Sequence, residues 1–139
     1  MDIEYLLKQV TEMWNGNNTP CDYGCLRKEM DVMITEAKRI YPDKPYCTIE
    51  KWVWTDLTVN KGTRKLYMEN GVQPAFVRSQ HIIDDEAKRS HLTNAVRSTA
   101  LVGFHKGCLF VTRNTCYILV GPGSRIEINP AILDYLVDW

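Results

Sequence analysis

The stretch RSTALVGFHKGCLFVTRNTCYILVGPGSR, which runs from Arg97 to Arg125, decides the predicted fold. It contains three short runs of apolar and β-branched residues, over 96–102, 108–112 and 115–120, a composition typical of β-strands. Turn-forming residues separate the runs, and Arg113-Asn114 falls between the second and the third. Strands joined by such short turns pair as antiparallel neighbours, so the stretch predicts a meander-like sheet.

More strands are predicted on both sides of this stretch. Asn60-Lys61-Gly62 and Asn70-Gly71 are turn signals, and Pro74 argues against a central position for the strand that contains it. Residues 79–95 have helix-forming residues but a weak apolar stripe, so they are interpreted as either a short helix or an exposed loop. The additional predicted strands are 49–59, 64–68, 72–77 and 126–128.

Three helices complete the prediction. Apolar residues recur at spacings of three and four over Asp2–Asn15 and over Leu26–Tyr41, which places them on one face of each helix. Asn129-Pro130 resembles a cap followed by proline and predicts a last helix near the C-terminus. The expected fold is therefore α+β: an N-terminal helical hairpin packed on a mostly antiparallel, meander-like sheet with a short C-terminal helix, forming a single domain over residues 1–139.

Composition narrows the class of protein. The chain has 139 residues, 45% of them hydrophobic, which is enough for one hydrophobic core. Its formal net charge is zero, and this argues against general nucleic-acid binding. The opening MDIEYLLKQV is unlike a signal peptide, and no apolar run approaches the roughly 20 residues that span a bilayer. Five cysteines, an odd number, predict free thiols and a cytoplasmic location without membrane contact.

Three arginines mark the candidate site, because each lies near the end of a predicted strand and beside hydroxyl or amide side chains. A guanidinium fork flanked by such groups is suited to an anionic ligand. If the predicted strand that starts near Arg97 and the next strand, which ends near Arg113, form an antiparallel hairpin, the two arginines lie at the same end of the sheet. The alternative is that the arginines are solvated sheet-edge residues or ion-pair partners. With a tryptophan that offers a stacking surface, the predicted ligand-binding residues are Arg97, Ser98, Thr99, Arg113, Asn114, Arg125 and Trp54.

Other reactive residues form no convincing constellation. Cys21 and Cys25 lack the second ligand pair that a zinc site needs, so no metal or cofactor is expected. The loop over 121–125 lacks the Lys-Ser/Thr ending of a phosphate-binding loop. Cys108 with His105, and the histidines at 81 and 91 with nearby acidic residues, are the acid–base or nucleophilic alternatives. No catalytic residue is assigned.

These observations favour a small, non-enzymatic cytosolic binding protein. Its expected ligand is an anionic small molecule, such as a nucleotide, and its expected role is that of a regulator or a phage-type sequestering antagonist. One alternative is a protein-interaction adaptor or inhibitor that acts through its helical surface. Another is a small hydrolase or transferase that uses His/Asp or Cys/His pairs. Trp139 and an apolar C-terminal segment further predict a homo-oligomer.

Overall fold

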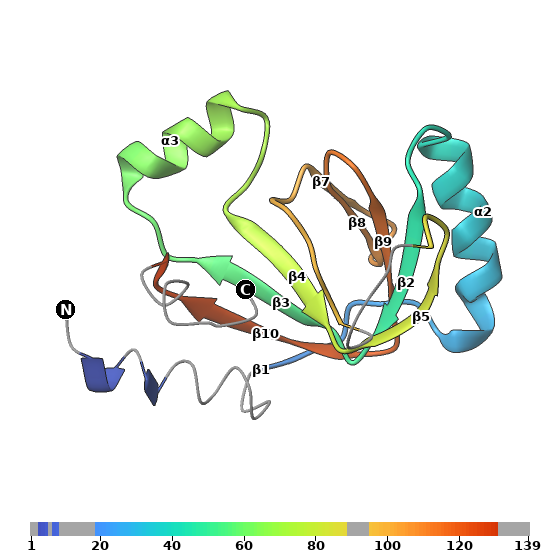
Figure 1. Ribbon diagram of the computed structural model, residues 1–139, viewed down its shortest axis with the longest axis horizontal. Coiled ribbons are helices and arrows are strands. Elements are labelled where there is room, and N and C mark those ends of the chain that lie inside the picture. The colour runs from blue at the N-terminus through green and yellow to red at the C-terminus, as the bar shows by residue number, and fades with distance from the viewer. Residues whose placement is uncertain (1–2, 6, 9–18, 89–94, 131–139) are drawn as a thin grey trace.

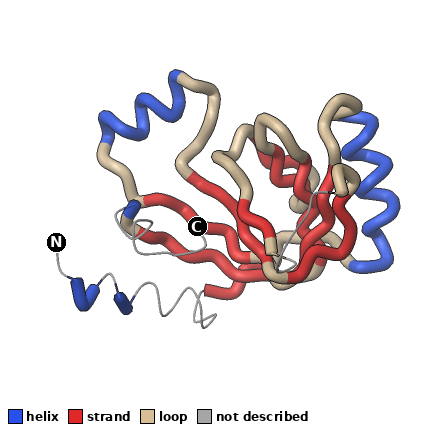
Figure 2. The backbone as a smooth tube through the Cα atoms, viewed as in Figure 1, coloured by secondary structure: helices blue, strands red, loops and turns tan. Residues whose placement is uncertain are grey.

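Two five-stranded sheets form the framework of the protein. The computed structural model describes residues 3–5, 7–8, 19–88 and 95–130 (Figures 1 and 2). The first sheet has the order β1 (Thr19–Cys21), β10 (Gly123–Ile128), β3 (Val53–Leu57), β4 (Ala75–Ser79) and β6 (Val96–Arg97). The second sheet has the order β5 (His81–Asp85), β2 (Tyr46–Glu50), β9 (Cys116–Val120), β8 (Leu109–Val111) and β7 (Gly103–His105).

Both sheets are mixed, which corrects the prediction of a single meander. β10 runs parallel to β3, with Arg125 beside Trp54, and β2 runs parallel to β9, with Thr48 beside Ile118. The chain passes repeatedly from one sheet to the other, so strands that follow each other in sequence often have partners far away in sequence. At Lys51, where φ is 50°, the chain turns between β2 and β3, which the sequence had joined as one strand.

The hydrophobic core lies between the two sheets. Trp54 and Val77 of the first sheet pack in one buried cluster with Ile49, Leu119 and Phe110 of the second sheet. This arrangement follows from the alternation of side chains along each strand, which sends every second residue to the inner face. The outward-facing residues of the second sheet pack in another cluster with α2 (Met30–Ile40), which covers that sheet on the right of Figure 1.

The predicted helical hairpin does not form among the residues that the structure describes. The helix predicted over 26–41 is present as η1 (Arg27–Glu29) followed by α2, and it packs on the second sheet. Before it the chain forms β1, where Cys21 pairs with Gly123 of β10, instead of a loop between two paired helices. Of the first predicted helix only residues 3–5 and 7–8 are described, and these are helical. The C-terminal helix predicted beyond Pro130 lies outside the described residues.

A further helix, α3 (Lys61–Glu69), replaces the predicted turn at 60–62 and the return strand at 64–68. Asn60 is its N-cap, and its side-chain oxygen accepts a hydrogen bond of 2.8 Å from the backbone N–H of Thr63. Asparagine is common both in turns and at helix N-caps. Asn60, which was interpreted as part of a turn, therefore marks the start of a helix. No residue of α3 is buried, and the helix stands apart from the sheets at the upper left of Figure 1.

The segment over 79–95 and the strand predicted over 96–102 also differ from their predictions, since only Val96–Arg97 of that strand forms β6. Part of the uncertain segment 79–95 is strand β5, an edge strand beside β2, and residues 89–94 lie outside the described part of the chain. The hairpin β7–β8 turns through Lys106 and Gly107, with φ values of 55° and 70°. Two consecutive positive φ angles are the mark of a type I′ hairpin turn. Among the described residues, no helix has the length and apolar character needed to cross a bilayer.

Candidate functional site

The three predicted arginines lie in three different parts of the molecule. Arg97 is on β6 at the edge of the first sheet, opposite Arg78 of β4. Arg113 lies after β8 of the second sheet, and its Nη2 donates a hydrogen bond to the backbone carbonyl of Asn70, just after α3. The hairpin partner of β8 is β7, so the antiparallel pairing that would bring Arg97 and Arg113 to one end of a sheet does not form.

Arg125 forms an internal ion pair with Asp56. Its Nε and Nη2 donate hydrogen bonds of 2.6 Å and 3.1 Å to the two carboxylate oxygens, and this bonding raises the pKa of the guanidinium. The same group lies 4.7 Å from the ring centre of Trp54, whose Nε1 donates to Asp56 Oδ1. Trp54 is buried and packs edge-on against Phe110. For Arg125, the structure matches the ion-pair alternative considered from the sequence.

Two of the predicted polar residues make local hydrogen bonds. Ser98 is buried, its Oγ donates to the carbonyl of Thr99 at 2.8 Å, and it accepts from the backbone N–H of Val77 at 2.8 Å. Asn114 Oδ1 accepts a hydrogen bond of 3.0 Å from Thr112 Oγ1 within the turn between β8 and β9. Both side chains therefore organise the backbone around them.

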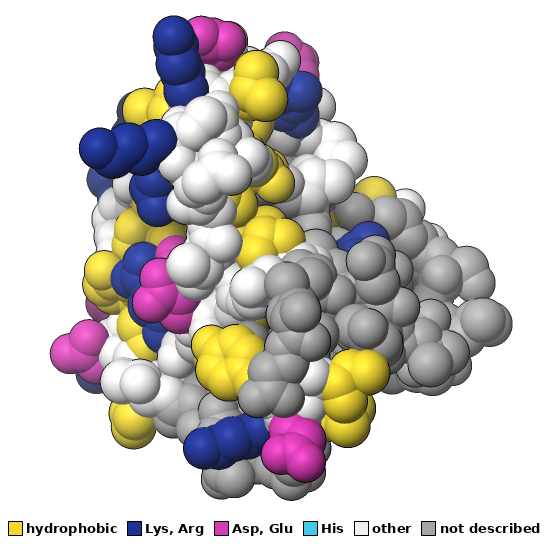
Figure 3. All heavy atoms as spheres, turned by 90° about the vertical axis from the view of Figure 1, so that its left-hand side faces the viewer, with side chains coloured by type: hydrophobic (Ala, Val, Ile, Leu, Met, Phe, Trp, Pro, Cys, Tyr) yellow, Lys and Arg dark blue, Asp and Glu magenta, His cyan; other side chains and the backbone are white. Residues whose placement is uncertain are grey.

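A surface pocket collects the remaining predicted residues. It has a volume of about 130 Å³ and lies between the edge of the first sheet and α3. Figure 3 views the side of the molecule that carries α3, where Lys and Arg side chains alternate with hydrophobic ones. The residues that give the pocket its chemistry are Leu57, Tyr67, Phe76, Arg97, Ser98 and Thr99.

The backbone beside the pocket departs from regular strand pairing. Ser98 N–H donates to the carbonyl of Val77, and Leu101 N–H donates to that of Ala75. Between these bonds the chain leaves the ladder over Thr99 and Ala100, which both line the pocket. Within the described residues, neither of their backbone N–H groups donates a hydrogen bond. Thr99 and Ala100 therefore each have a backbone donor that makes no such bond, and both residues line the pocket together with Arg97.

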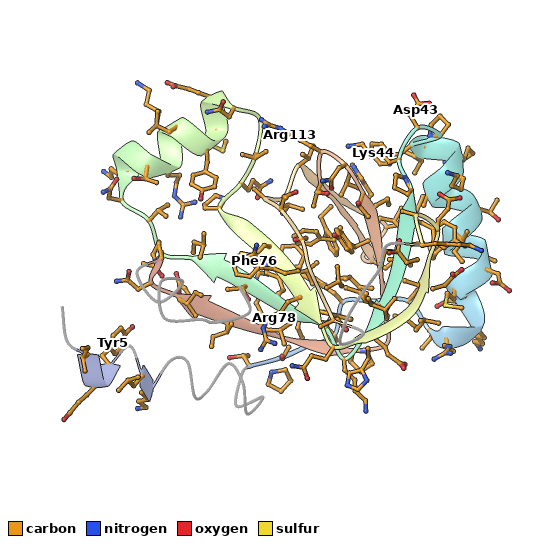
Figure 4. All side chains as sticks on the ribbon, viewed as in Figure 1. Tyr5, Asp43, Lys44, Phe76, Arg78 and Arg113 are labelled. Atoms are coloured by element: carbon orange, nitrogen blue, oxygen red, sulfur yellow. The ribbon has the colours of Figure 1, made fainter. Side chains whose placement is uncertain are left out.

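Sequence reasoning missed Arg78, the cross-strand partner of Arg97. Arg78 is only 9% exposed, and burial lowers the pKa of its guanidinium. Figure 4 shows Arg78 and Phe76 as neighbours on β4, with Arg113 towards the other end of the sheets. An arginine within the apolar run AFVRS was the available signal. Tyr67 was missed because its segment was predicted as a strand.

Three of the residues named in the enzymatic alternatives, Cys108, His105 and His81, lie in the described part of the chain. Burial raises the pKa of the Cys108 thiol to about 12, so the nucleophilic thiolate is disfavoured at neutral pH. His105 Nε2 lies 2.7 Å from the hydroxyl of Tyr41 and is engaged there. His81 is exposed on the edge strand β5, and His91 lies outside the described residues. In the part of the chain that the structure describes, no group of three His, Cys, Asp or Glu side chains is placed to hold a metal ion.

Fold and site together define a protein with two mixed sheets, peripheral helices and a small arginine-bearing pocket. Residues 22–133 match the family described as a domain of unknown function, DUF6957. This match covers most of the chain, so the protein belongs to that family. No curated protein and no solved structure matches the chain.

Proposed function

We propose that the protein is a non-enzymatic binder of a small anionic molecule and that the pocket beside Arg97 is its site. The observation that carries this proposal is the convergence of Arg97, Ser98 and Thr99 with Tyr67 and Phe76 around one cavity. The pocket replaces the three-arginine clamp as the site, since Arg113 and Arg125 are engaged elsewhere.

The pocket offers the two kinds of contact that an organic anion needs. The Arg97 guanidinium and the N–H groups of Thr99 and Ala100 can donate hydrogen bonds to an oxyanion. Each hydrogen bond to a charged group contributes about 1.5–3 kcal/mol. Phe76 and Tyr67 supply aromatic surface for the rest of the ligand, in place of Trp54.

The size of the pocket limits what it encloses. Pockets that surround a whole drug-sized molecule have volumes of roughly 300–1,000 Å³, whereas this one has about 130 Å³. It therefore accommodates an anionic group with a small apolar body. A nucleotide would place only one end there and leave the remainder on the surface near α3.

A thermal-shift panel tests the proposal. Inorganic phosphate, AMP, benzoate and uncharged phenol are added in turn to the wild-type protein and to Arg97→Ala and Arg113→Ala variants. Binding at 100 times Kd stabilises the folded state by about 2.7 kcal/mol, which raises Tm by several degrees. We expect at least one anion to raise Tm in the wild type and in Arg113→Ala but not in Arg97→Ala.

Two results would overturn the proposal. One is the absence of any shift with every anion at millimolar concentration. The other is an undiminished shift in Arg97→Ala, which would place the anion elsewhere. An equal loss of the Tm shift in both variants would instead support the original hypothesis that Arg97 and Arg113 bind the anion together.

A further inference from the structure

We propose that one edge of the molecule binds the phosphate backbone of a single-stranded nucleic acid. This basic edge consists of Lys61 and Arg64 on α3, Arg113 in the turn between β8 and β9, and Lys44 just before β2. Figure 4 shows Arg113 between α3 and Lys44 along the top of the molecule. The proposal goes beyond the proposed function and does not involve the Arg97 guanidinium.

Hydrogen bonds join the three parts of the basic edge. Arg113 Nη2 donates to the carbonyl of Asn70, the C-cap of α3. Lys44 Nζ donates to the carbonyl of Thr112 at 2.5 Å and to that of Arg113 at 3.1 Å. These acceptors are neutral, so they position the two cations without cancelling their charges.

The two α3 cations are accessible to a large partner. Lys61 and Arg64 are exposed, and their spacing of three residues places them on one face of the helix. The half-buried residues of α3 are Thr63 and Tyr67, which are four residues apart, and Tyr67 lines the pocket. Since no residue of α3 is buried, a strand can lie along the helix without displacing the core.

The positive charges of the basic edge are not neutralised within the described part of the chain. None of its four side chains takes part in an ion pair there. Lys65 is not counted, because its Nζ lies 3.9 Å from a carboxylate oxygen of Glu69. Asp43 is an acidic residue at this edge, next to Lys44 in Figure 4. The formal net charge of zero therefore conceals a local excess of positive charge.

The length of the basic edge fits a chain of phosphates better than an isolated anion. The nine residues of α3 span about 13 Å at 1.5 Å per residue. The edge then continues from the C-terminus of the helix to Arg113 and Lys44. Cations spread over such a length can contact several phosphates of one strand, and the release of counterions from these phosphates favours binding.

Aromatic rings beside Lys44 favour a single strand over a duplex. His105 is exposed, and its Nε2 lies 2.7 Å from the hydroxyl oxygen of Tyr41, which orients the imidazole. The centre of the Tyr41 ring is 5.9 Å from that of His105 and 5.5 Å from Lys44 Nζ. Unpaired bases can stack on such rings, whereas the bases of a duplex are already stacked on each other.

Fluorescence anisotropy with labelled oligothymidylate and oligouridylate of about twelve nucleotides tests the proposal. For a single strand, the logarithm of the association constant falls with the logarithm of the salt concentration, with a slope of about −0.7 per phosphate contact. Four contacts predict a slope of about −2.8, which is about a fiftyfold loss of affinity between 50 and 200 mM NaCl. Binding of either strand with this slope supports the proposal, and the tighter strand identifies the class, DNA or RNA.

Variants test the position of the strand. Lys61→Ala combined with Arg64→Ala should weaken binding several-fold and reduce the slope to about −1.4, because two contacts are lost. Alanine is the best helix former, so α3 should remain folded, which a thermal melt verifies. Lys28→Ala is the matched control, since Lys28 is an exposed cation of η1, at the other end of α2 from Lys44. Asp43→Asn should tighten binding, because it removes a negative charge from the edge.

Other measurements separate the basic edge from the pocket. Arg97→Ala should leave the affinity for the strand unchanged. Phenyl phosphate, a pocket probe with one phosphate and one aromatic ring, should not displace the strand. Loss of strand binding in Arg97→Ala would overturn the proposal and assign the strand to the pocket.

Three further results would overturn the proposal. One is the absence of an anisotropy change with either strand at 50 mM NaCl. Another is an equal loss of affinity in Lys28→Ala and in the α3 double variant, which would mean that the strand is attracted by any exposed cation. The third is binding to vesicles of anionic phospholipid without binding to either strand, which would assign the basic edge to a membrane surface.

Discussion

Asp56 shows how a single residue determines what a neighbouring arginine does. Its carboxylate holds Arg125 through two hydrogen bonds and also accepts one from the Trp54 indole. Arg97 lines the pocket, so two arginines that look alike in sequence have different surroundings. The sequence identified both arginines as notable but could not assign their roles, because Asp56 lies 69 residues from Arg125 along the chain.

Replacing Asp56 should therefore affect stability rather than ligand binding. The side chains of Arg125 and Asp56 are 40% and 31% exposed, so solvent screens their attraction. We expect Asp56→Asn to lower the free energy of unfolding by about 1 kcal/mol in urea titrations. The control is Glu50→Gln, which breaks the more exposed pair with Arg27 and should cost less. A loss of anion binding in Asp56→Asn would contradict the separation of the two sites.

The buried thiols should make the protein less stable at alkaline pH. Burial raises the pKa of Cys108 from 9.0 to about 12 and that of Cys116 to about 11. The neutral thiols stabilise the fold fully below pH 9, and this stability is lost as pH rises towards the folded-state pKa values, because the unfolded chain ionises first. Urea unfolding between pH 8 and 10.5 should show this decline.

Cys108→Ala isolates the effect of one thiol. One thiol that ionises only in the unfolded chain contributes up to about 1.4 kcal/mol per pH unit to the slope. The slope between pH 9 and 10.5 should therefore be shallower in Cys108→Ala, whereas Cys21→Ala, at a partly exposed position, should keep the wild-type slope. Identical slopes in all three proteins would mean that Cys108 ionises normally in the folded state.

At the scale of elements, close packing explains why β10 begins with glycine. A Cβ on Gly123 would overlap the buried ring and the backbone carbonyl of Trp52. We expect Gly123→Ala to destabilise the protein by at least about 1–3 kcal/mol, the usual cost of overpacking. Gly62→Ala is the matched control, because Gly62 lies exposed in α3 and alanine is the better helix former by about 1 kcal/mol. Equal melting temperatures for the two variants would contradict this contrast.

α3 should be the least protected described helix until a ligand binds. It buries no residue, and Tyr67 is the residue that it contributes to the pocket. Amide hydrogen exchange should therefore be faster in α3 than in α2, and a saturating anion should slow it. Tyr67→Ala should remove that slowing with less than about 1 kcal/mol change in global stability. Protection of α3 that is unaffected by every anion would separate the helix from the site.

The predictability of the elements depended on whether their signals were local. The helix over 26–41 and the strand at 115–120 had clear periodicity or composition and appear near their predicted positions as α2 and β9. Asn60 illustrates the opposite case, since the same residue type starts turns and caps helices. Lys51 adopts a positive φ that no local residue preference indicated, so β2 and β3 were joined into one strand.

At the scale of the whole molecule, the sheet topology and the position of the pocket depend on strand pairing, which could not be predicted from the sequence. The parallel contact between β3 and β10 joins residues about seventy positions apart in the sequence. The alternation of hydrophobic residues predicts which face of a strand is buried, but not which strand pairs with it. The adaptor alternative relied partly on the apolar face of the helix over 26–41, but that face packs on the second sheet. The pocket at the edge of the first sheet is likewise a product of topology, because it combines β4, β6 and α3.

A ¹H–¹⁵N correlation titration of the wild-type protein with phenyl phosphate tests the central claim most directly. The claim is that the anion binds beside Arg97, in the pocket that Thr99 and Ala100 also line. We predict saturable shifts of the Arg97, Thr99 and Ala100 amide signals, with those of Arg125 and Asn114 unchanged. Shifts centred on Arg113, Asn114 or Arg125, or no shifts at millimolar phenyl phosphate, would contradict it.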